Sequence, residues 1–200
     1  MPTTLITPAA GLPMTLEDVK THLRMDGNAE DSLVTDYIRA ATEYIEAATG
    51  IQIMRATWEA TSNGFPTYCD DDGYMAIRLP RPPLVSVVSV SYVDTDGTTQ
   101  TLTEGTDYAV DTRKQPGRVV PYYGASWPTA RDQPNSVTVR YVAGYLATAD
   151  VPHKIKQAIR YLVTHYDRFR QPVISGTIQT EVDQTLQALL AIEKHWTFGD

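Results

Sequence analysis

The sequence has 200 residues, 42% of them hydrophobic and 20% charged, so the chain can bury a core and is not expected to be disordered as a whole. Seventeen basic and 24 acidic side chains give a net charge of −7, which argues against a surface that seeks nucleic acid or anionic membranes. No run of about 18 apolar residues is present, so no transmembrane helix is expected. The first residues also lack the pattern of a secretory signal. The single cysteine, Cys69, excludes an intramolecular disulfide and fits synthesis in the cytoplasm.

Charge is distributed unevenly along the chain. Residues 1–50 carry three basic and eight acidic side chains, residues 51–150 carry eight and eleven, and residues 151–200 carry six and five. The two ends therefore differ electrostatically, as head-to-tail partners require, although ordinary scatter accounts for the difference equally well.

The N-terminal part predicts a loose segment followed by a helix. Residues 1–14 contain three prolines and a glycine without periodicity, so we expect a flexible N-terminal arm. Thr15 is expected to cap a helix that stops near Asp26-Gly27. Two carboxylates in its first turn, Glu17 and Asp18, would stabilise it through the helix dipole.

A second and longer helix is predicted from about Glu30. Apolar residues recur there at three- and four-residue spacing, and Gly50 supplies the stop. The expected apolar stripe is Leu33, Val34, Tyr37, Ile38, Ala41, Tyr44, Ile45 and Ala48.

After Ile51 the pattern changes to that of strands. Three prolines, at positions 80, 82 and 83, exclude a central ladder position and indicate an edge or a crossover. The alternation within 84–93 slips, which predicts a bulge near Val87-Val88, and Asp96-Gly97 indicates a hairpin turn. The predicted strands are 57–61, 75–79, 84–93, 98–102, 108–111, 118–121 and 136–142.

Helix returns after Asp150, which is expected to cap a segment with Pro152 in its first turn and Pro172 at its end. A last helix, marked by Val182, Leu186, Leu189 and Leu190, precedes the tail. The predicted fold class is therefore α+β. Helices from both ends of the chain form one body, and a small antiparallel β domain is inserted between them. The expected divisions are 1–14 (arm), 15–50 with 150–193 (discontinuous helical domain), 51–149 (β-rich insertion) and 194–200 (tail).

Motifs that carry chemistry are missing from the sequence. The four histidines show no H-x-x-x-H spacing, and Cys69 has no C-x-x-C partner, so no zinc site is predicted. The segment 26–31 lacks the glycine and the distal glutamate of a calcium loop, and is better explained as a turn between helices. Asp70-Asp71-Asp72 could hold a hard cation, but an exposed acidic turn explains it better. Pro128 stands where a nucleophile elbow requires glycine, and no phosphate-binding loop is present. We predict no catalytic, cofactor-binding or metal-binding residues, and no enzyme.

Two regions suggest contacts with partners. The predicted helix over 153–170 carries five basic residues against one acid, Asp167, and could face phosphates or an acidic protein, although a solvated helix face explains it more simply. The tail carries aromatic residues that could anchor in the groove of a partner or fold back on their own domain. The candidate basic residues are Lys154, Lys156, Arg160, Arg168 and Arg170, and the candidate tail anchors are His195, Trp196 and Phe198.

An ordered series of short motifs resembles one protein family. Thr15–Arg24 opens the helical part, and Ile77–Leu84, with the run Ile-Arg-Leu-Pro-Arg-Pro-Pro-Leu, lies in the β region. Pro116–Pro121, Ser126–Pro128, Pro134–Tyr145 and Val151–Ile159 follow in order. Together they resemble the head–tail connector, or adaptor, proteins of long-tailed bacteriophages, prophages and gene transfer agents, over about Thr15 to Tyr166.

The resemblance implies a structural protein of the virion neck, assembled in the bacterial cytoplasm. It implies a ring, usually a dodecamer, beneath the portal protein, which joins the capsid to a stopper or tail-completion protein. DNA would pass through its channel without specific binding, and no cofactor or membrane is implied. The resemblance also implies that the C-terminal segment engages the portal, although the chain departs from the family most strongly after Phe169. A nucleic-acid-binding module using the basic helix, and a metal-dependent hydrolase using scattered acids and histidines, are the alternatives from the residues alone.

Overall fold

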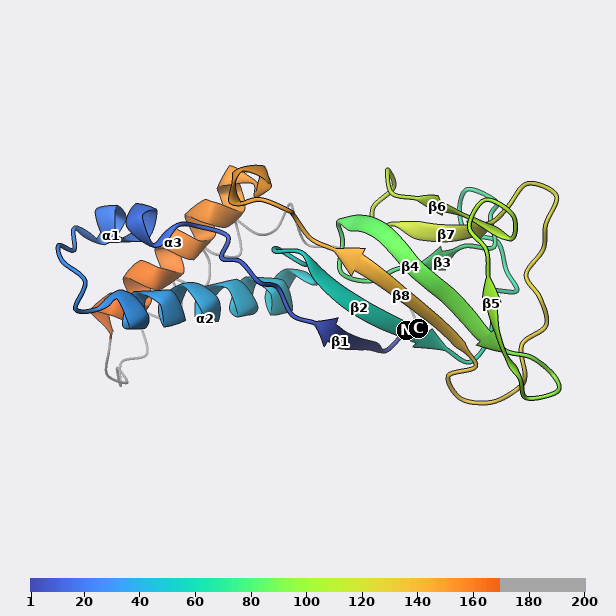
Figure 1. Ribbon diagram of the computed structural model, residues 1–200. Helices are drawn as coiled ribbons and strands as arrows, with labels where there is room; N and C mark the ends of the chain where they lie inside the picture. Colours follow the sequence, from blue (N-terminus) through green and yellow to red (C-terminus); the bar gives the residue numbers. More distant parts are fainter. Residues whose placement is uncertain (170–200) are drawn as a thin grey trace, which may run out of the picture. The chain divides into compact units, whose positions relative to one another are not determined.

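The computed structural model describes residues 1–169 and divides them into two compact units (Figure 1). The helical unit consists of Ala10–Met54 and residues 145–169, and the β unit consists of Met1–Ala9 and Arg55–Gly144. The expected division into domains stays a prediction, because compactness does not show that either unit folds alone. The expected last helix and the tail 194–200 lie outside the described residues.

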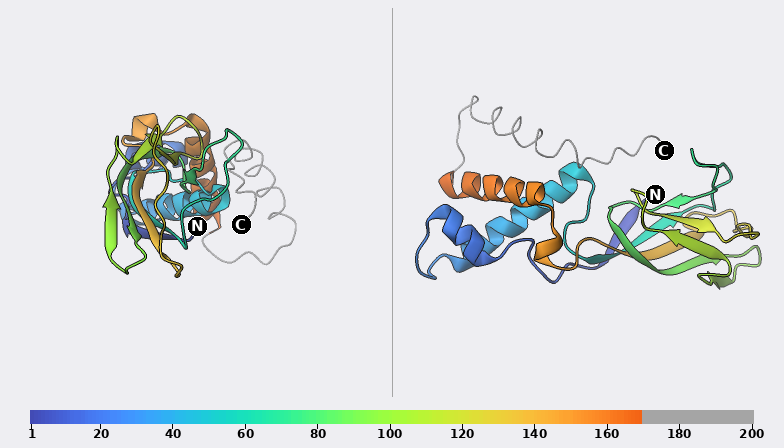
Figure 2. Two further views of the ribbon diagram at one scale, coloured as in Figure 1. Left: turned by 90° about the vertical axis from the view of Figure 1, so that its right-hand side faces the viewer. Right: turned by 90° about the horizontal axis from the view of Figure 1, so that it is seen from above.

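Three α-helices and a short 3₁₀ helix form the helical unit (Figure 2). Thr15 caps α1 as predicted, since its hydroxyl accepts a hydrogen bond from the backbone N–H of Asp18 at 3.1 Å. Gly50 ends α2 in the left-handed conformation at φ 73°, also as predicted. The helices are α1 (Leu16–Leu23), α2 (Asp31–Thr49) and α3 (His153–Arg168), and the 3₁₀ helix is η1 (Thr148–Asp150).

The helices pack along narrow apolar stripes. The core of the helical unit includes Val19 from α1, five residues of α3 and four apolar residues of α2. The predicted α2 stripe is wrong at Tyr44 and Ala48, which are exposed. The buried stripe of α2 is narrower than the one predicted from the three- and four-residue spacing of its apolar residues. The prediction that Asp150 caps α3 is also wrong: Pro152 precedes α3, and the Asp150 carboxylate instead accepts from the Ala147 N–H at 3.2 Å. The stripes are Val34, Ile38, Ala41 and Ile45 in α2, and Ile155, Ala158, Ile159, Leu162 and Val163 in α3.

Two antiparallel sheets form the β unit. Five strands pair in the order β1-β2-β8-β4-β5 and three in the order β3-β7-β6. The α+β class is confirmed, but the expected small β insertion is wrong, because the five-stranded sheet is one of the two main parts of the protein. The strands are β1 (Thr3–Thr7), β2 (Ala56–Ser62), β3 (Ile77–Arg78), β4 (Leu84–Val93), β5 (Thr99–Leu102), β6 (Tyr108–Asp111), β7 (Arg118–Pro121) and β8 (Val137–Ala143).

The expected flexible arm is wrong in its first half, which forms β1. Thr3 pairs with Ala60 and Leu5 with Trp58, so β1 is the edge strand beside β2. Pro2 and Pro8 flank this strand without interrupting it, and prolines are tolerated at strand ends and edges. Residues 1–9 thus belong to the β unit, although the helices begin only a few residues later.

The strand pairing and the turns of the β unit confirm two local predictions. The pairing of β4 with β8 shifts between Val87 and Ser89, which is the expected bulge. Asp96-Gly97 makes the turn between β4 and β5, with Gly97 at φ 88°. Between the sheets the core gathers large side chains, among them Tyr141, whose hydroxyl donates to the Pro80 carbonyl at 2.9 Å.

Candidate assembly surfaces

The predicted basic residues lie on the side of α3 away from its core stripe. Lys154 and Arg168 are exposed, and Lys156 and Arg160 are partly exposed. Arg170 and the tail residues His195, Trp196 and Phe198 lie outside the described part of the chain. We call Lys156 and Arg160, which are four residues apart and share a face of α3, the basic stripe.

The basic stripe lacks local charge partners. Within residues 1–169, neither of its two side chains forms an ion pair, and α3 has no acid in its first turn. Between Asp150 and Asp167 the sequence has no carboxylate at all. The stripe therefore presents its positive charge to the surroundings.

An acidic surface lies on the neighbouring helix of the same unit. His22 Nε2 lies 3.0 Å from Thr164 Oγ1, which places α1 against α3. Glu17 and Asp18, on α1, are exposed, as is Asp26 in the turn that follows. Within residues 1–169 these carboxylates form no ion pair, and we call the two in the first turn of α1, Glu17 and Asp18, the acidic patch.

A lysine holds together the turn that superficially resembles a calcium loop. The Lys20 ammonium donates to Asn28 Oδ1 at 3.1 Å and to Asp31 Oδ1 at 2.8 Å, and the lysine residue is only 8% exposed. A protein cation thus already neutralises the oxygens that a metal would need. The interpretation as a turn between helices fits these contacts.

The acidic run in the β unit is also bound by protein cations. Arg118 Nη1 donates to Asp70 Oδ2 and to Asp72 Oδ2, both at 2.6 Å, and Arg118 Nε donates to Asp111 Oδ2 at 3.1 Å. Lys114 pairs with Asp72 as well. The run is therefore part of an ion-pair network that fixes the connection between β2 and β3 to β7.

Hydrogen bonds set the charge state of this network. Desolvation opposes ionisation of Asp70, but the backbone N–H of Tyr74 and the Arg118 guanidinium outweigh it and lower the pKa of the Asp70 carboxyl. The same balance of desolvation against hydrogen bonds lowers the pKa of Asp111. Both carboxylates stay ionised, as a network that binds arginine requires.

Two loops of the β unit expose aromatic side chains. Trp127 Nε1 donates to the Met75 carbonyl at 2.6 Å, and the Trp127 ring stacks on Phe65 with centroids 4.8 Å apart, so the loops are fixed to one another. Tyr123 is 99% exposed and Tyr68 is 87% exposed. Such rings are suited to protein contacts, and no periodic pattern in the sequence singles them out.

Residues that could carry chemistry are dispersed in the described part of the protein. No group of three or more His, Cys, Asp or Glu side chains within residues 1–169 is placed to hold a metal ion. No helix in that range is long and apolar enough to cross a membrane. What residues 1–169 do present is a set of charged and aromatic surfaces on two compact units.

The fold is that of solved neck and virion proteins of gene transfer agent particles. One match is described as the neck of an empty particle computed with C6 symmetry, with a TM-score of 0.74 and 19% identity. A second, from the virion of a native particle, has a TM-score of 0.75 and 19% identity. A third, the neck of a native particle computed with C12 symmetry, has a TM-score of 0.71 and 18% identity. Each comparison covers 100% of this chain and 99% of the other.

The sequence also matches a family of connector proteins. Residues 13–91 match the model of the family described as "Phage gp6-like head-tail connector protein", which confirms the predicted resemblance over that segment. This is a structural connector family and not a family of enzymes. No curated protein matches the chain.

Proposed function

We propose that this protein is a head–tail connector subunit of a phage-like particle, located in the neck and acting without catalysis. The observation that supports it most strongly is the similarity of fold to neck proteins along the whole chain. The family match over residues 13–91 supports the same function from sequence.

The proposed assembly is a ring of twelve identical subunits beneath a portal protein. Particle necks computed with C6 and C12 symmetry, which contain proteins of this fold, support the closed ring. A closed ring needs two different, complementary surfaces on each subunit. Two compact units and two oppositely charged helical surfaces offer such a pair.

The proposed partners are the portal protein on one side and a stopper or tail-completion protein on the other. DNA is proposed to pass through the ring without being held. A net charge of −7 suits a conduit, because each phosphate neutralised by the protein adds affinity that slows sliding. The C-terminal tail is the proposed contact with the portal.

The proposal can be tested by co-expression with a portal protein from the same genome, followed by electron microscopy of the purified complex. We expect a ring of this protein on one end of the portal. A portal that stays bare, at protein concentrations well above those in a particle-producing cell, would refute the function.

A further inference from the structure

The N-terminal half of α3 breaks the usual electrostatic rules of a helix. Lys154 and Lys156 lie in the first turn, where the helix dipole favours acids and disfavours cations, and no acid accompanies them. Lys156 and Arg160 are four residues apart, so two like charges share one face and repel each other. Local stability therefore does not explain the basic stripe, and departures of this kind are expected where function requires them.

The surroundings of the stripe favour a protein partner over a nucleic acid. Residues 10–54, the other part of the helical unit, contain three basic and eight acidic side chains. The contact between His22 and Thr164 brings α1, with Glu17 and Asp18, against α3. A duplex laid along α3 would meet these carboxylates, whereas a protein surface can place opposite charges against each part.

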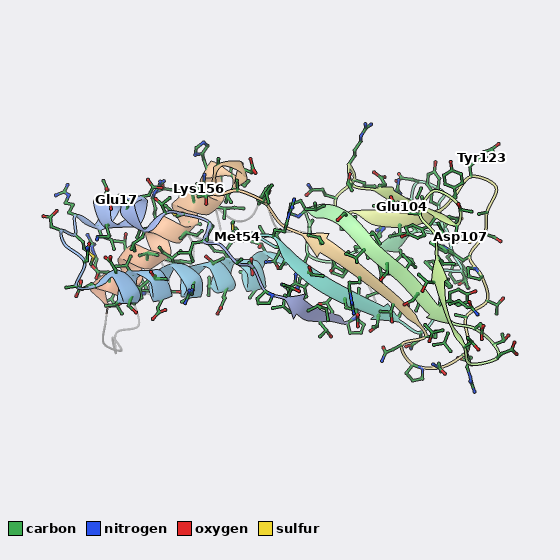
Figure 3. All side chains as sticks on the ribbon, in the orientation of Figure 1. Glu17, Met54, Glu104, Asp107, Tyr123 and Lys156 are labelled. Atoms are coloured by element: carbon green, nitrogen blue, oxygen red, sulfur yellow. The ribbon has the colours of Figure 1, made fainter. Side chains whose placement is uncertain are left out.

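We propose that the basic stripe of one subunit docks on the acidic patch of a second copy of the same chain. The inference deepens the proposed function, because it names the surfaces that join neighbours in the ring. Glu17 on α1 and Lys156 on α3 both project outward from the helical unit (Figure 3). Each subunit thus carries one basic and one acidic surface for contact with other copies.

The charges available are balanced for such a contact. Two cations, Lys156 and Arg160, would face two carboxylates, Glu17 and Asp18, and none of the four has an ion pair within residues 1–169. Each exposed pair contributes little alone, so the contact is weak in free solution. A portal that holds several copies side by side would raise the effective concentration and strengthen it.

The inference is tested with charge-reversal variants of the 200-residue protein. Their self-association is measured by sedimentation equilibrium at up to about 1 mM protein and low salt. Lys156→Glu with Arg160→Glu should weaken self-association about tenfold. Glu17→Lys with Asp18→Lys should weaken it similarly. An equimolar mixture of the two variants should restore association, since the altered surfaces are complementary again.

A matched control distinguishes the effect of altering these two surfaces from the effect of changing the net charge. Arg113→Glu with Arg131→Glu makes the same charge change at exposed positions of the β unit and should leave self-association unchanged. An equal loss in this control, or no recovery in the mixture, would overturn the inference. Glutamate near the start of α3 favours that helix, whereas lysine at positions 17 and 18 removes the acids from the first turn of α1. Circular dichroism of every variant therefore measures any loss of helix beside the loss of association.

Two further results would also overturn the inference while leaving the proposed function intact. One is a wild-type protein that stays monomeric at every concentration tested, which would show that the two surfaces do not bind each other. The proposed function would remain, because a ring assembled on a portal does not need this contact. The other is salt-dependent binding of a 20-base-pair duplex that is lost on Lys156→Glu with Arg160→Glu, which would make the stripe a phosphate surface.

Discussion

Arg118 and Asp70 are 48 positions apart in the sequence, yet Arg118 Nη1 donates to Asp70 Oδ2 at 2.6 Å in the β unit. The two side chains are only 9% and 6% exposed. Their pair joins the irregular connection after β2 to β7. The loop that carries Tyr68 and Tyr74 therefore has a fixed position on the three-stranded sheet.

Replacing the arginine should loosen this loop and destabilise the β unit. Arg118→Met leaves the Asp70 carboxylate buried without the arginine. We expect the free energy of unfolding to fall by about 2 kcal/mol. This is less than for a fully buried ion pair, because the other carboxylates of the network reach solvent. Denaturant unfolding followed by fluorescence of Trp58 and Trp127, in a Trp196→Phe background, measures the change.

Arg78→Met is the matched control for that experiment. Arg78 pairs with Asp71 at 3.4 Å and lies 4.0 Å from Asp70, but the Arg78 side chain is 48% exposed, so solvent screens both contacts. Its loss should change stability by less than about 0.5 kcal/mol. Equal effects of the two substitutions would show that burial of Arg118 has no energetic role.

The same network predicts how stability depends on pH. The pKa of Asp70 in the folded protein lies below the ordinary aspartate value of 3.8, because hydrogen bonds from Tyr74 and Arg118 overcome the desolvation that raises it. The stabilisation is therefore present above pH 3.8 and is lost as the pH falls through the lowered pKa. Asp70→Asn should be less stable than wild type at pH 7, and the difference should shrink below about pH 4. A constant difference between pH 7 and pH 3 would contradict this assignment.

Lys20 is predicted to stabilise the turn between α1 and α2. Lys20→Met removes the ammonium that binds Asn28 and Asp31, and should cost about 1–2 kcal/mol of helical-unit stability. Thermal unfolding followed by circular dichroism at the helix band measures it. Arg39→Met is the control, because its 3.7 Å pair with Asp36 is exposed on both sides and should contribute almost nothing.

Charge at the two ends of α3 should act in opposite directions on stability. Lys154→Glu replaces a cation with an acid at the helix start and should stabilise the helical unit by about 0.5 kcal/mol. Arg168→Glu makes the same charge change at the other end and should destabilise it by a similar amount. Circular dichroism melts at low salt test both, and a gain from Arg168→Glu would exclude the dipole explanation.

Local signals allowed much of the fold to be predicted from sequence. Thr15 and Gly50 mark helix ends through side-chain capping and left-handed backbone, which depend only on neighbouring residues. The slip near Val87-Val88 and the turn at Asp96-Gly97 are equally local. Such features need no knowledge of distant contacts.

The errors arose where distant contacts decide the structure. β1 forms because residues 3–7 pair with β2 residues fifty or more positions later, and nothing within 1–14 indicates that pairing. The breadth of the five-stranded sheet likewise depends on β8 lying between β2 and β4. Tyr44 matched the apolar spacing of α2 but is exposed, because spacing alone does not show how wide a stripe the neighbouring helices cover.

The candidate surfaces were predictable only in part. The basic residues of α3 follow from sequence, whereas their lack of partners and the neighbouring acidic patch required the packing of α1 on α3. The ion pairs of Asp70 and Asp72 with Arg118 also depend on residues far apart in the chain.

Structure determination of the particle neck by electron microscopy tests the central proposal most directly. Particles made in a cell that carries this gene should contain a closed ring of the protein between the portal and the tail. Cells without the gene should accumulate DNA-filled heads that lack tails. Tailed, infectious or transfer-competent particles made without the gene would contradict the proposal.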